Sequence, residues 1–222
     1  MKNKLKRFFL DLLFPKTCFG CQKPETYLCC DCEAILEVSD IHKKLKTEQL
    51  SDLYFALEYK KSLIKTLISQ FKCQPFIKEL SRPLSSLIIN HFQLIEKNKN
   101  DFKDFIIIPV PLHIKKLKWR GFNQAEEIGK HLSEFFKIPL INNVLIKKHE
   151  TIAQTELAGI KRERNVLNVF QCENTKVIKN KNIILIDDIY ITGSTINECA
   201  RVLKQSGAGK VIGIVVAITE PK

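Results

Sequence analysis

The sequence has few of the residues that mark non-globular chains. Its 222 residues include 8 glycines and 8 prolines, too few for a collagen-like or low-complexity chain. No apolar run approaches the 18 or so residues that cross a bilayer, so we expect no transmembrane helix. The chain also has fewer acidic than basic residues. Its 24 Asp and Glu residues against 36 Lys and Arg residues give a formal net charge of +12. This excess favours phosphates, nucleic acid or an anionic membrane as partners, although a lysine-rich composition without any ligand explains it equally well.

The N-terminus lacks the features of a secretory signal. Its apolar stretch is only about seven residues long, Asp11 interrupts it, and no small-residue cleavage site follows. Apolar residues instead recur at helical spacing, and Pro15 ends the pattern, so we expect a short amphipathic helix within residues 1–14. That helix would pack on the rest of the protein or, as the weaker alternative, lie on a membrane surface. We therefore predict a cytoplasmic protein, with peripheral attachment to the inner face of the membrane as the alternative.

Cysteine supplies the first strong chemical signal. Cys18 and Cys21 form one C-x-x-C pair, and Cys29 and Cys32 form a second. A two-residue spacing lets a tight turn direct both sulfurs at one tetrahedral ion, and a second pair completes a four-cysteine site. Zinc suits such thiolates best, with an iron–sulfur centre as the alternative, and disulfides rarely persist in a reducing compartment. We predict a structural Zn²⁺ at these four residues, with the other four cysteines as bystanders.

Strand-like and helix-like patterns alternate from residue 105 onward. Short continuous apolar runs predict strands buried on both faces, at 105–108, 183–186 and 211–218. Helical periodicity alternates with them, at 123–136 and 197–205. The preceding part of the chain adds a strand-like segment at 53–59 and helical periodicity at 63–71 and 83–95. This order predicts βαβ units and a mostly parallel sheet flanked by helices, in which ligands bind beyond the carboxyl ends of strands.

Two acidic residues, Asp187 and Asp188, directly follow the apolar run at 183–186. The turn Thr192-Gly193-Ser194-Thr195 then opens a helix, and such a turn, with its backbone N–H groups and hydroxyls, can cradle an anion. The carboxylates cannot hold the same phosphate, because like charges repel, so they suit neighbouring hydroxyls or a divalent cation. Together these features describe a site for a ribose 5-phosphate. A capped helix beside two surface aspartates is the alternative, but it leaves the position of the acidic pair unexplained.

The thirteen residues 183–195 resemble the phosphoribosyl-diphosphate (PRPP) motif of type I phosphoribosyltransferases. Residues 109–113 and 119–124, which include Arg120-Gly-Phe-Asn-Gln124, resemble the ComF family of competence proteins, as do Gln154, residues 162–166 and Phe170. The ComF family also has a four-cysteine zinc module after a Phe-Pro pair, here Phe14-Pro15. Two positions depart from the family pattern: Asn168-Val169 replaces the usual Gly-Ala, and Lys148 stands where Arg is frequent.

The resemblance implies an α/β phosphoribosyltransferase-like domain at 46–222, preceded by a zinc-ribbon-like module at 1–45. It also implies PRPP and Mg²⁺ at the strand ends, and a role in DNA uptake during natural transformation beside the competence machinery at the cytoplasmic face of the membrane. Asp187 and Asp188 would bind the ribose hydroxyls, directly or through the metal. The 5-phosphate would lie on Thr192, Gly193, Ser194 and Thr195. Leu112, His113 and Arg120 would face the diphosphate, and residues 154–164 would form a mobile flap.

Whether the chain turns PRPP over is left open by its sequence. No general base is evident and no base-recognition pocket can be identified. The chain is thus either a binding scaffold or an active phosphoribosyltransferase that acts on a small-molecule base, with Asp187, Asp188 and Arg120 as its catalytic residues. A purely structural adaptor held together by zinc is a third reading, which the intact motif at 183–195 disfavours.

A basic band supports contact with single-stranded DNA. Lys115, Lys116, Lys118 and Arg120 lie within six residues that contain no acid, and Trp119 could stack on a base. A solvated face and a packed tryptophan are the alternative interpretations. The basic residues within 1–14 offer a second place for the DNA site.

Overall fold

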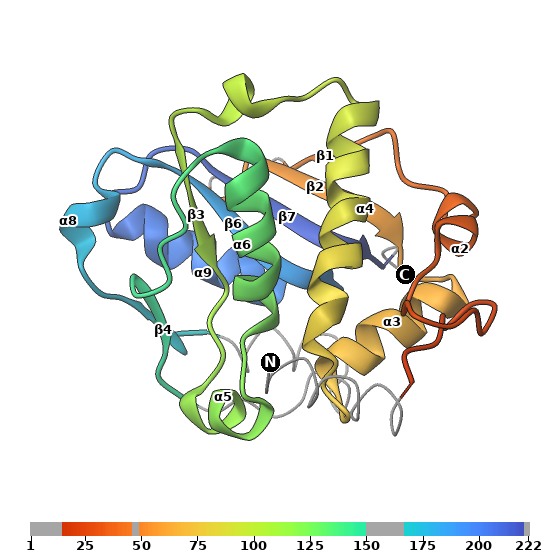
Figure 1. The fold of residues 1–222 in the computed structure, drawn as a ribbon. Coiled ribbons are helices and arrows are strands. Elements are labelled where there is room, and N and C mark those ends of the chain that lie inside the picture. The colour runs from red at the N-terminus through yellow and green to blue at the C-terminus, as the bar shows by residue number, and fades with distance from the viewer. Residues whose placement is uncertain (1–14, 46–48, 150–166, 220–222) are drawn as a thin grey trace, which may run out of the picture.

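The computed structural model describes residues 15–45, 49–149 and 167–219. The amphipathic helix expected within residues 1–14 and the flap expected at 154–164 lie outside these ranges. Within the described part of the chain, a five-stranded sheet has the strand order β1-β2-β7-β6-β3 (Figure 1). Its strands are β1 (Lys43–Lys44), β2 (Asp52–Glu58), β3 (Phe105–Pro109), β6 (Asn182–Tyr190) and β7 (Val211–Ile218). Only β1 is antiparallel to its neighbour in this sheet, so the predicted mostly parallel sheet is confirmed.

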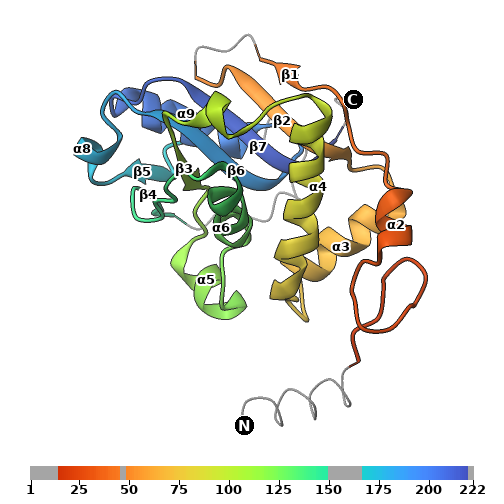
Figure 2. The same ribbon diagram turned by 45° about the horizontal axis from the view of Figure 1, so that its top comes forward.

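Helices cover both faces of the sheet. The longer helices, of seven or more residues, are α3 (Ser62–Lys72), α4 (Ser81–Leu94), α5 (Ile114–Arg120), α6 (Gln124–Phe136) and α9 (Ser194–Gln205). The shorter ones are α2 (Cys30–Ala34), η1 (Lys78–Leu80), η2 (Lys99–Phe102) and α8 (Thr175–Ile178). Figures 1 and 2 show α4 and α6 on one face and α9 on the other. The apolar residues of β3, β6 and β7 are buried because helices pack on both sides of them, as continuous apolar runs predict.

Strand β6 is longer than the sequence predicts. The apolar run ends at Ile186, but pairing with β7 continues from Asp187, opposite Val215, to Tyr190, opposite Ile218. The eight apolar residues of β7 supply a backbone partner over this whole length, so the strand persists after its own side chains become polar. The acidic pair therefore lies inside the last part of a strand rather than in the loop after it.

The basic band forms a helix, α5, for which the sequence patterns gave no signal. All seven residues of α5 are described, and none of them is buried. A helix without an inward apolar stripe has no hydrophobic periodicity, which is the signal that sequence reading depends on. Gly121 ends α5 in the left-handed conformation, with φ of +84°.

A two-stranded antiparallel ribbon was also missed. It pairs β4 (Leu145–Lys147) with β5 (Phe170–Cys172), one on each side of residues 150–166. Strands of three residues are too short to show an alternating pattern. Among the residues that the structure places, no helix is long and apolar enough to cross a membrane.

Candidate functional site

The four predicted zinc ligands lie together at the N-terminal end of the described chain. The Sγ atoms of Cys18, Cys21, Cys29 and Cys32 all lie within 4.8 Å of one another. The Cys18–Cys29 and Cys21–Cys29 sulfur distances are 3.7 and 3.5 Å. Four thiolates bound to one zinc at about 2.3 Å stand about 3.8 Å apart, so the cluster has the dimensions of a tetrahedral zinc site.

Backbone N–H groups also point at these sulfurs. The Cys18 sulfur accepts from Gly20 and from Cys29, each at 3.4 Å. Burial opposes ionisation of Cys18, but the backbone N–H groups of Cys21, Cys29 and Gly20 together outweigh it and lower the pKa of the thiol to about 6. A Cβ on Gly20 would lie 2.5 Å from the Cys32 sulfur, so the first turn requires glycine. Cys30, which we expected to be a bystander, is exposed and lies outside the cluster.

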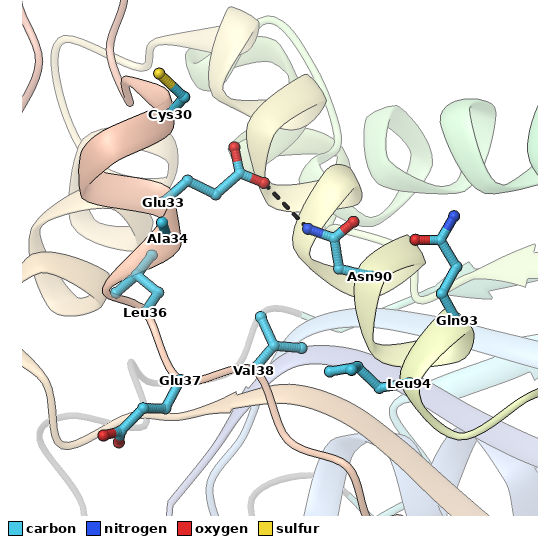
Figure 3. Close-up of a pocket in the computed structure, with 9 residues that line it drawn as sticks. All are labelled: Cys30, Glu33, Ala34, Leu36, Glu37, Val38, Asn90, Gln93 and Leu94. Atoms are coloured by element: carbon cyan, nitrogen blue, oxygen red, sulfur yellow. Dashed lines mark hydrogen bonds between the residues drawn. The ribbon is translucent and has the colours of Figure 1, made fainter.

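The cysteine module is fixed to the rest of the molecule through Glu33 of α2. Its Oε1 accepts from Asn90 and from Ser86 of α4, each at 3.3 Å. Figure 3 shows the Asn90 contact at the edge of a surface pocket of about 700 Å³ between α2 and α4. The cysteine cluster, which includes Cys32 of α2, therefore lies beside an element that contacts the main domain.

The acidic pair lies near the carboxyl end of β6, and its two members have different surroundings. The ammonium of Lys72, at the end of α3, forms an ion pair with the carboxylate of Asp188, and the distance from Nζ to Oδ1 is 3.0 Å. The side chain of Asp188 is only 6% exposed. Asp187 instead lines a small hollow made by the loop of residues 189–196. This split follows from strand geometry, because successive side chains point to opposite faces of a sheet.

The environment of Asp187 favours its protonated form. Burial, and then the negative charge of Asp188, raise the pKa of Asp187 to about 7, although Lys72 opposes the shift. For Lys72, the effect of the neighbouring charges on the pKa outweighs the effect of burial. Burial lowers the pKa of its ammonium, but Asp188 and Asp187 together raise it above the ordinary value. Lys72 is therefore charged at neutral pH, and no motif in the sequence marks it.

The turn 192–195 is shaped as an anion cradle. Gly193 has a φ of +77° and begins α9, and the hydroxyls of Thr192 and Ser194 are 2.6 Å apart. A Cβ on Gly193 would overlap the ring of Tyr190, which packs against it. Glycine is therefore needed here both for the left-handed backbone and for the close approach of the ring. Thr195 follows in the first turn of α9, as the motif predicts.

Two buried side-chain nitrogens without described partners come from the segment that follows β3. Leu112 and His113 lie between β3 and α5, and Arg120 ends α5. The Nδ1 atom of His113 and the Nε atom of Arg120 are buried, and neither has a hydrogen-bond partner among the described residues. Burial lowers the pKa of Arg120 while Asp188 raises it, so the guanidinium stays charged and lies close enough to the carboxylate to be stabilised by it.

The residues after Arg120 hold the site together. Gly121 ends α5, and Asn123 begins α6 by accepting from the Ala125 N–H at 3.2 Å. The Asn123 amide also donates to the Val110 carbonyl at 3.0 Å, and the Gln124 amide donates to the Phe71 carbonyl of α3 at 3.2 Å. The Arg-Gly-Phe-Asn-Gln element thus joins the loop after β3, helix α6 and the end of α3.

The lysines of the basic band lie along α5 with exposed apolar residues. Trp119 is 62% exposed and Ile114 is 55% exposed. Trp119 contacts Phe76 edge-on, with 4.7 Å between ring centroids, and the guanidinium of Arg120 lies 5.8 Å from the same ring. Trp119 is therefore neither fully packed nor isolated, and Arg120 has a buried Nε atom and is influenced by the charge of Asp188.

One departure from the ComF pattern has a structural explanation. Asn168, which replaces the family's usual glycine, has a φ of +58°. Asparagine is one of the few residues that tolerate this left-handed conformation. Its N–H donates to Glu198 of α9 at 2.8 Å, and Glu198 also pairs with Arg201 at 2.7 Å. Asparagine therefore suits this position, where a glycine would also fit.

Comparison with known proteins agrees with this geometry. Residues 120–222 match the phosphoribosyl transferase domain. Competence protein F of Haemophilus influenzae is 29% identical over 199 residues, which cover 87% of this chain and 86% of that protein. The chain is a homologue of the ComF competence proteins. The ComF resemblance and the type I phosphoribosyltransferase-like fold that the motifs predicted are thus confirmed.

Two further relatives extend the comparison. Competence protein ComFC of Bacillus subtilis is 29% identical over 196 residues, which cover 86% of this chain and 72% of that protein. The DNA utilization protein YhgH of Shigella flexneri is 31% identical over 105 residues. That match spans 47% of this chain and 45% of YhgH, so about half of each protein is compared.

Proposed function

We propose that this ComF homologue binds PRPP together with Mg²⁺ and also binds single-stranded DNA, in DNA uptake during natural transformation. The observation that carries the proposal is the convergence at the end of β6. Two carboxylates, a left-handed glycine turn and two buried nitrogens without described partners come from segments at the same strand ends. This combination suits a ligand that has both phosphates and neighbouring hydroxyls.

The residues present fit both PRPP and its metal. Asp187 and Asp188 offer the oxygen ligands that Mg²⁺ prefers, or acceptors for the ribose hydroxyls. The turn from Thr192 to Thr195 offers backbone N–H groups at the start of a twelve-residue helix for the 5-phosphate. His113, Arg120 and the backbone at Leu112 would face the diphosphate, whose charge Mg²⁺ would partly neutralise.

The chain's own groups would act by position and charge. Arg120 would stabilise negative charge on the diphosphate, and the acidic pair would orient the ribose. Binding without turnover therefore accounts for every residue described at the site. An active phosphoribosyltransferase acting on a small-molecule base is the second candidate function, favoured by the match of residues 120–222 to that domain. In that case a nitrogen nucleophile would attack the sugar as diphosphate leaves.

The DNA contact is assigned to α5. Lys115, Lys116 and Lys118 would neutralise backbone phosphates, and the exposed face of Trp119 would stack on a base. Because Arg120 ends the same helix and is influenced by the charge of Asp188, DNA and PRPP would bind to neighbouring parts of one element. Zn²⁺ at Cys18, Cys21, Cys29 and Cys32 would be structural, and the same four residues would hold it.

Calorimetric titration of PRPP, with and without Mg²⁺, tests the ligand. Fluorescence anisotropy of a labelled single-stranded oligonucleotide, with and without PRPP, tests the nucleic acid. We expect Mg²⁺-dependent PRPP binding and salt-sensitive DNA binding. No heat with PRPP at millimolar protein would refute the ligand assignment, and consumption of PRPP with any base would favour the transferase.

A further inference from the structure

Lys72 brings a positive charge to the acidic pair from a part of the chain that no motif marks. It is the last residue of α3 and lies 116 positions before Asp188. The Asp188 side chain is 6% exposed, whereas that of Lys72 is 43% exposed. A ligand that approaches the Asp188 carboxylate from solvent therefore meets the ammonium first.

The backbone of Lys72 is held firmly on both sides. The Phe71 side chain is fully buried, and its carbonyl accepts from Gln124 of α6 at 3.2 Å. The Cys73 N–H donates to the Ser69 carbonyl at 2.7 Å and closes the helix. Movement at this position is thus confined to the flexible side chain, whose four-carbon stem can carry the ammonium between nearby anions.

A second cation, Arg120, lies within the electrostatic influence of the same carboxylate. The negative charge of Asp188 acts on Arg120, and the positive charge of Arg120 acts on Lys72. The acidic pair thus has two cations near it, and among the described residues Lys72 is the one that forms a direct ion pair with Asp188. An ammonium 3.0 Å from Oδ1 also occupies the position from which a divalent cation or a ribose hydroxyl would bind that oxygen. The arrangement therefore suits an incoming group with several negative charges, which would take over one of the two cations.

We propose that Lys72 is a diphosphate-binding residue that acts as the counter-ion of Asp188 until the ligand arrives. This inference rests on the proposed PRPP function. On binding, Lys72 releases Oδ1 of Asp188 and turns to a diphosphate oxygen, so that its charge is paired in both states. Asp188 then becomes free to hold the ribose or the metal.

The movement of Lys72 from Asp188 to the diphosphate can be tested in the wild-type protein, without a mutation. The lysines are acylated, and their modification rates are measured by mass spectrometry. Lys78 is the internal control, because it also pairs with a buried carboxylate, Glu127 of α6, at 3.1 Å. PRPP with Mg²⁺ should lower the modification rate of Lys72 about fivefold or more and leave that of Lys78 unchanged. Equal rates at Lys72 with and without the ligand would overturn the proposal.

Calorimetry of matched variants tests the same point. Lys72→Gln should weaken PRPP binding about tenfold or more, since one charge-assisted contact is lost. Lys78→Gln removes the same charge and a comparable ion pair, and should bind PRPP as the wild type does. Lys72→Arg, which keeps the charge, should recover most of the affinity. PRPP binding by Lys72→Gln at wild-type affinity would overturn this inference alone, whereas no binding by the wild type would overturn the proposed function with it.

A double-mutant cycle tests whether Lys72 neutralises Asp188 in the protein without ligand. Lys72→Gln should lower the melting temperature in the wild-type background but not in the Asp188→Asn background, because the carboxylate that needs a counter-ion is then gone. Equal losses in both backgrounds would show that Lys72 does not neutralise Asp188.

Discussion

The side-chain amide of Asn123 donates a hydrogen bond to the carbonyl of Val110, 3.0 Å away, while its oxygen caps helix α6. One buried side chain thus fixes both the start of a core helix and the loop that leads to His113. We expect Asn123→Ala to lower the free energy of unfolding by about 1–3 kcal/mol, because a cap is lost and a buried carbonyl is left without a donor. It should also weaken PRPP binding by displacing the loop. Urea unfolding and calorimetry measure the two effects.

The control for Asn123 is Asn142, an exposed residue whose amide donates to Glu126 at 3.1 Å. Asn142→Ala should change stability by less than about 0.5 kcal/mol, as is usual at exposed positions. If Asn123→Ala were as harmless as this control, the Arg-Gly-Phe-Asn-Gln element would have no structural role.

The cysteine cluster should hold about one zinc per chain. Cys29→Ser should abolish stoichiometric zinc and destabilise the region up to about residue 40, because thiolate sites commonly hold small modules folded. Cys30→Ser is the matched control, since Cys30 is exposed and outside the cluster, and it should keep its zinc. Elemental analysis and limited proteolysis measure the outcome. Metal-free wild-type protein with a protease-resistant module would contradict the assignment.

Single-stranded DNA binding should depend steeply on salt through α5. Each phosphate contact should add about 0.7 to the slope of log affinity against log salt. Replacing Lys115, Lys116 and Lys118 with alanine should therefore flatten the slope by up to about two units and leave PRPP binding largely intact. The exposed lysines around α8, Lys176, Lys179 and Lys181, serve as the control, because their replacement removes the same charge. Equal slopes for the two triple variants would place the DNA site elsewhere.

The acidic pair and the glycine turn should both be needed for PRPP. Asp188→Asn keeps the side-chain shape but removes a charge, and should weaken binding about tenfold or more in the presence of Mg²⁺. Gly193→Val should be worse, because its side chain would overlap Tyr190 and the position requires a φ of +77°. Gly207, at a φ of +93° after α9, supplies a control for backbone strain away from the site. Wild-type PRPP affinity in Asp188→Asn would mean that the acidic pair is structural.

Stability should fall with rising pH because of Asp187. Its pKa is about 7 in the folded protein against an ordinary 3.8, so between these values the folded state binds more protons than the unfolded state. Stability therefore declines from about pH 4 to about pH 7, by up to about 4 kcal/mol before solvent screening reduces it. Asp187→Asn should remove this decline, whereas Asp104→Asn, at an exposed position, should retain it. Melting temperatures across this range give the comparison, and parallel profiles for wild type and Asp187→Asn would disprove the assignment.

The sequence by itself determined the features whose chemistry is local. Two C-x-x-C pairs can only place their sulfurs near one another through short turns, so the cluster at Cys18 to Cys32 followed from spacing alone. The apolar runs of β3, β6 and β7 predicted strands covered on both faces, as in a parallel sheet flanked by helices. The turn at Gly193 needed a residue that tolerates a left-handed backbone.

Only the tertiary structure decided which distant groups meet. Lys72 lies 116 positions from Asp188, and Gln124 lies 53 positions from Phe71, so no local pattern could pair them. The split of Asp187 and Asp188 between different surroundings came from the continuation of β6 along β7, which depends on a partner strand rather than on the acidic residues themselves. Helix α5 was hidden for a related reason. None of its residues is buried, so its sequence lacks the periodic apolar pattern that is the primary signal of a helix in a single sequence.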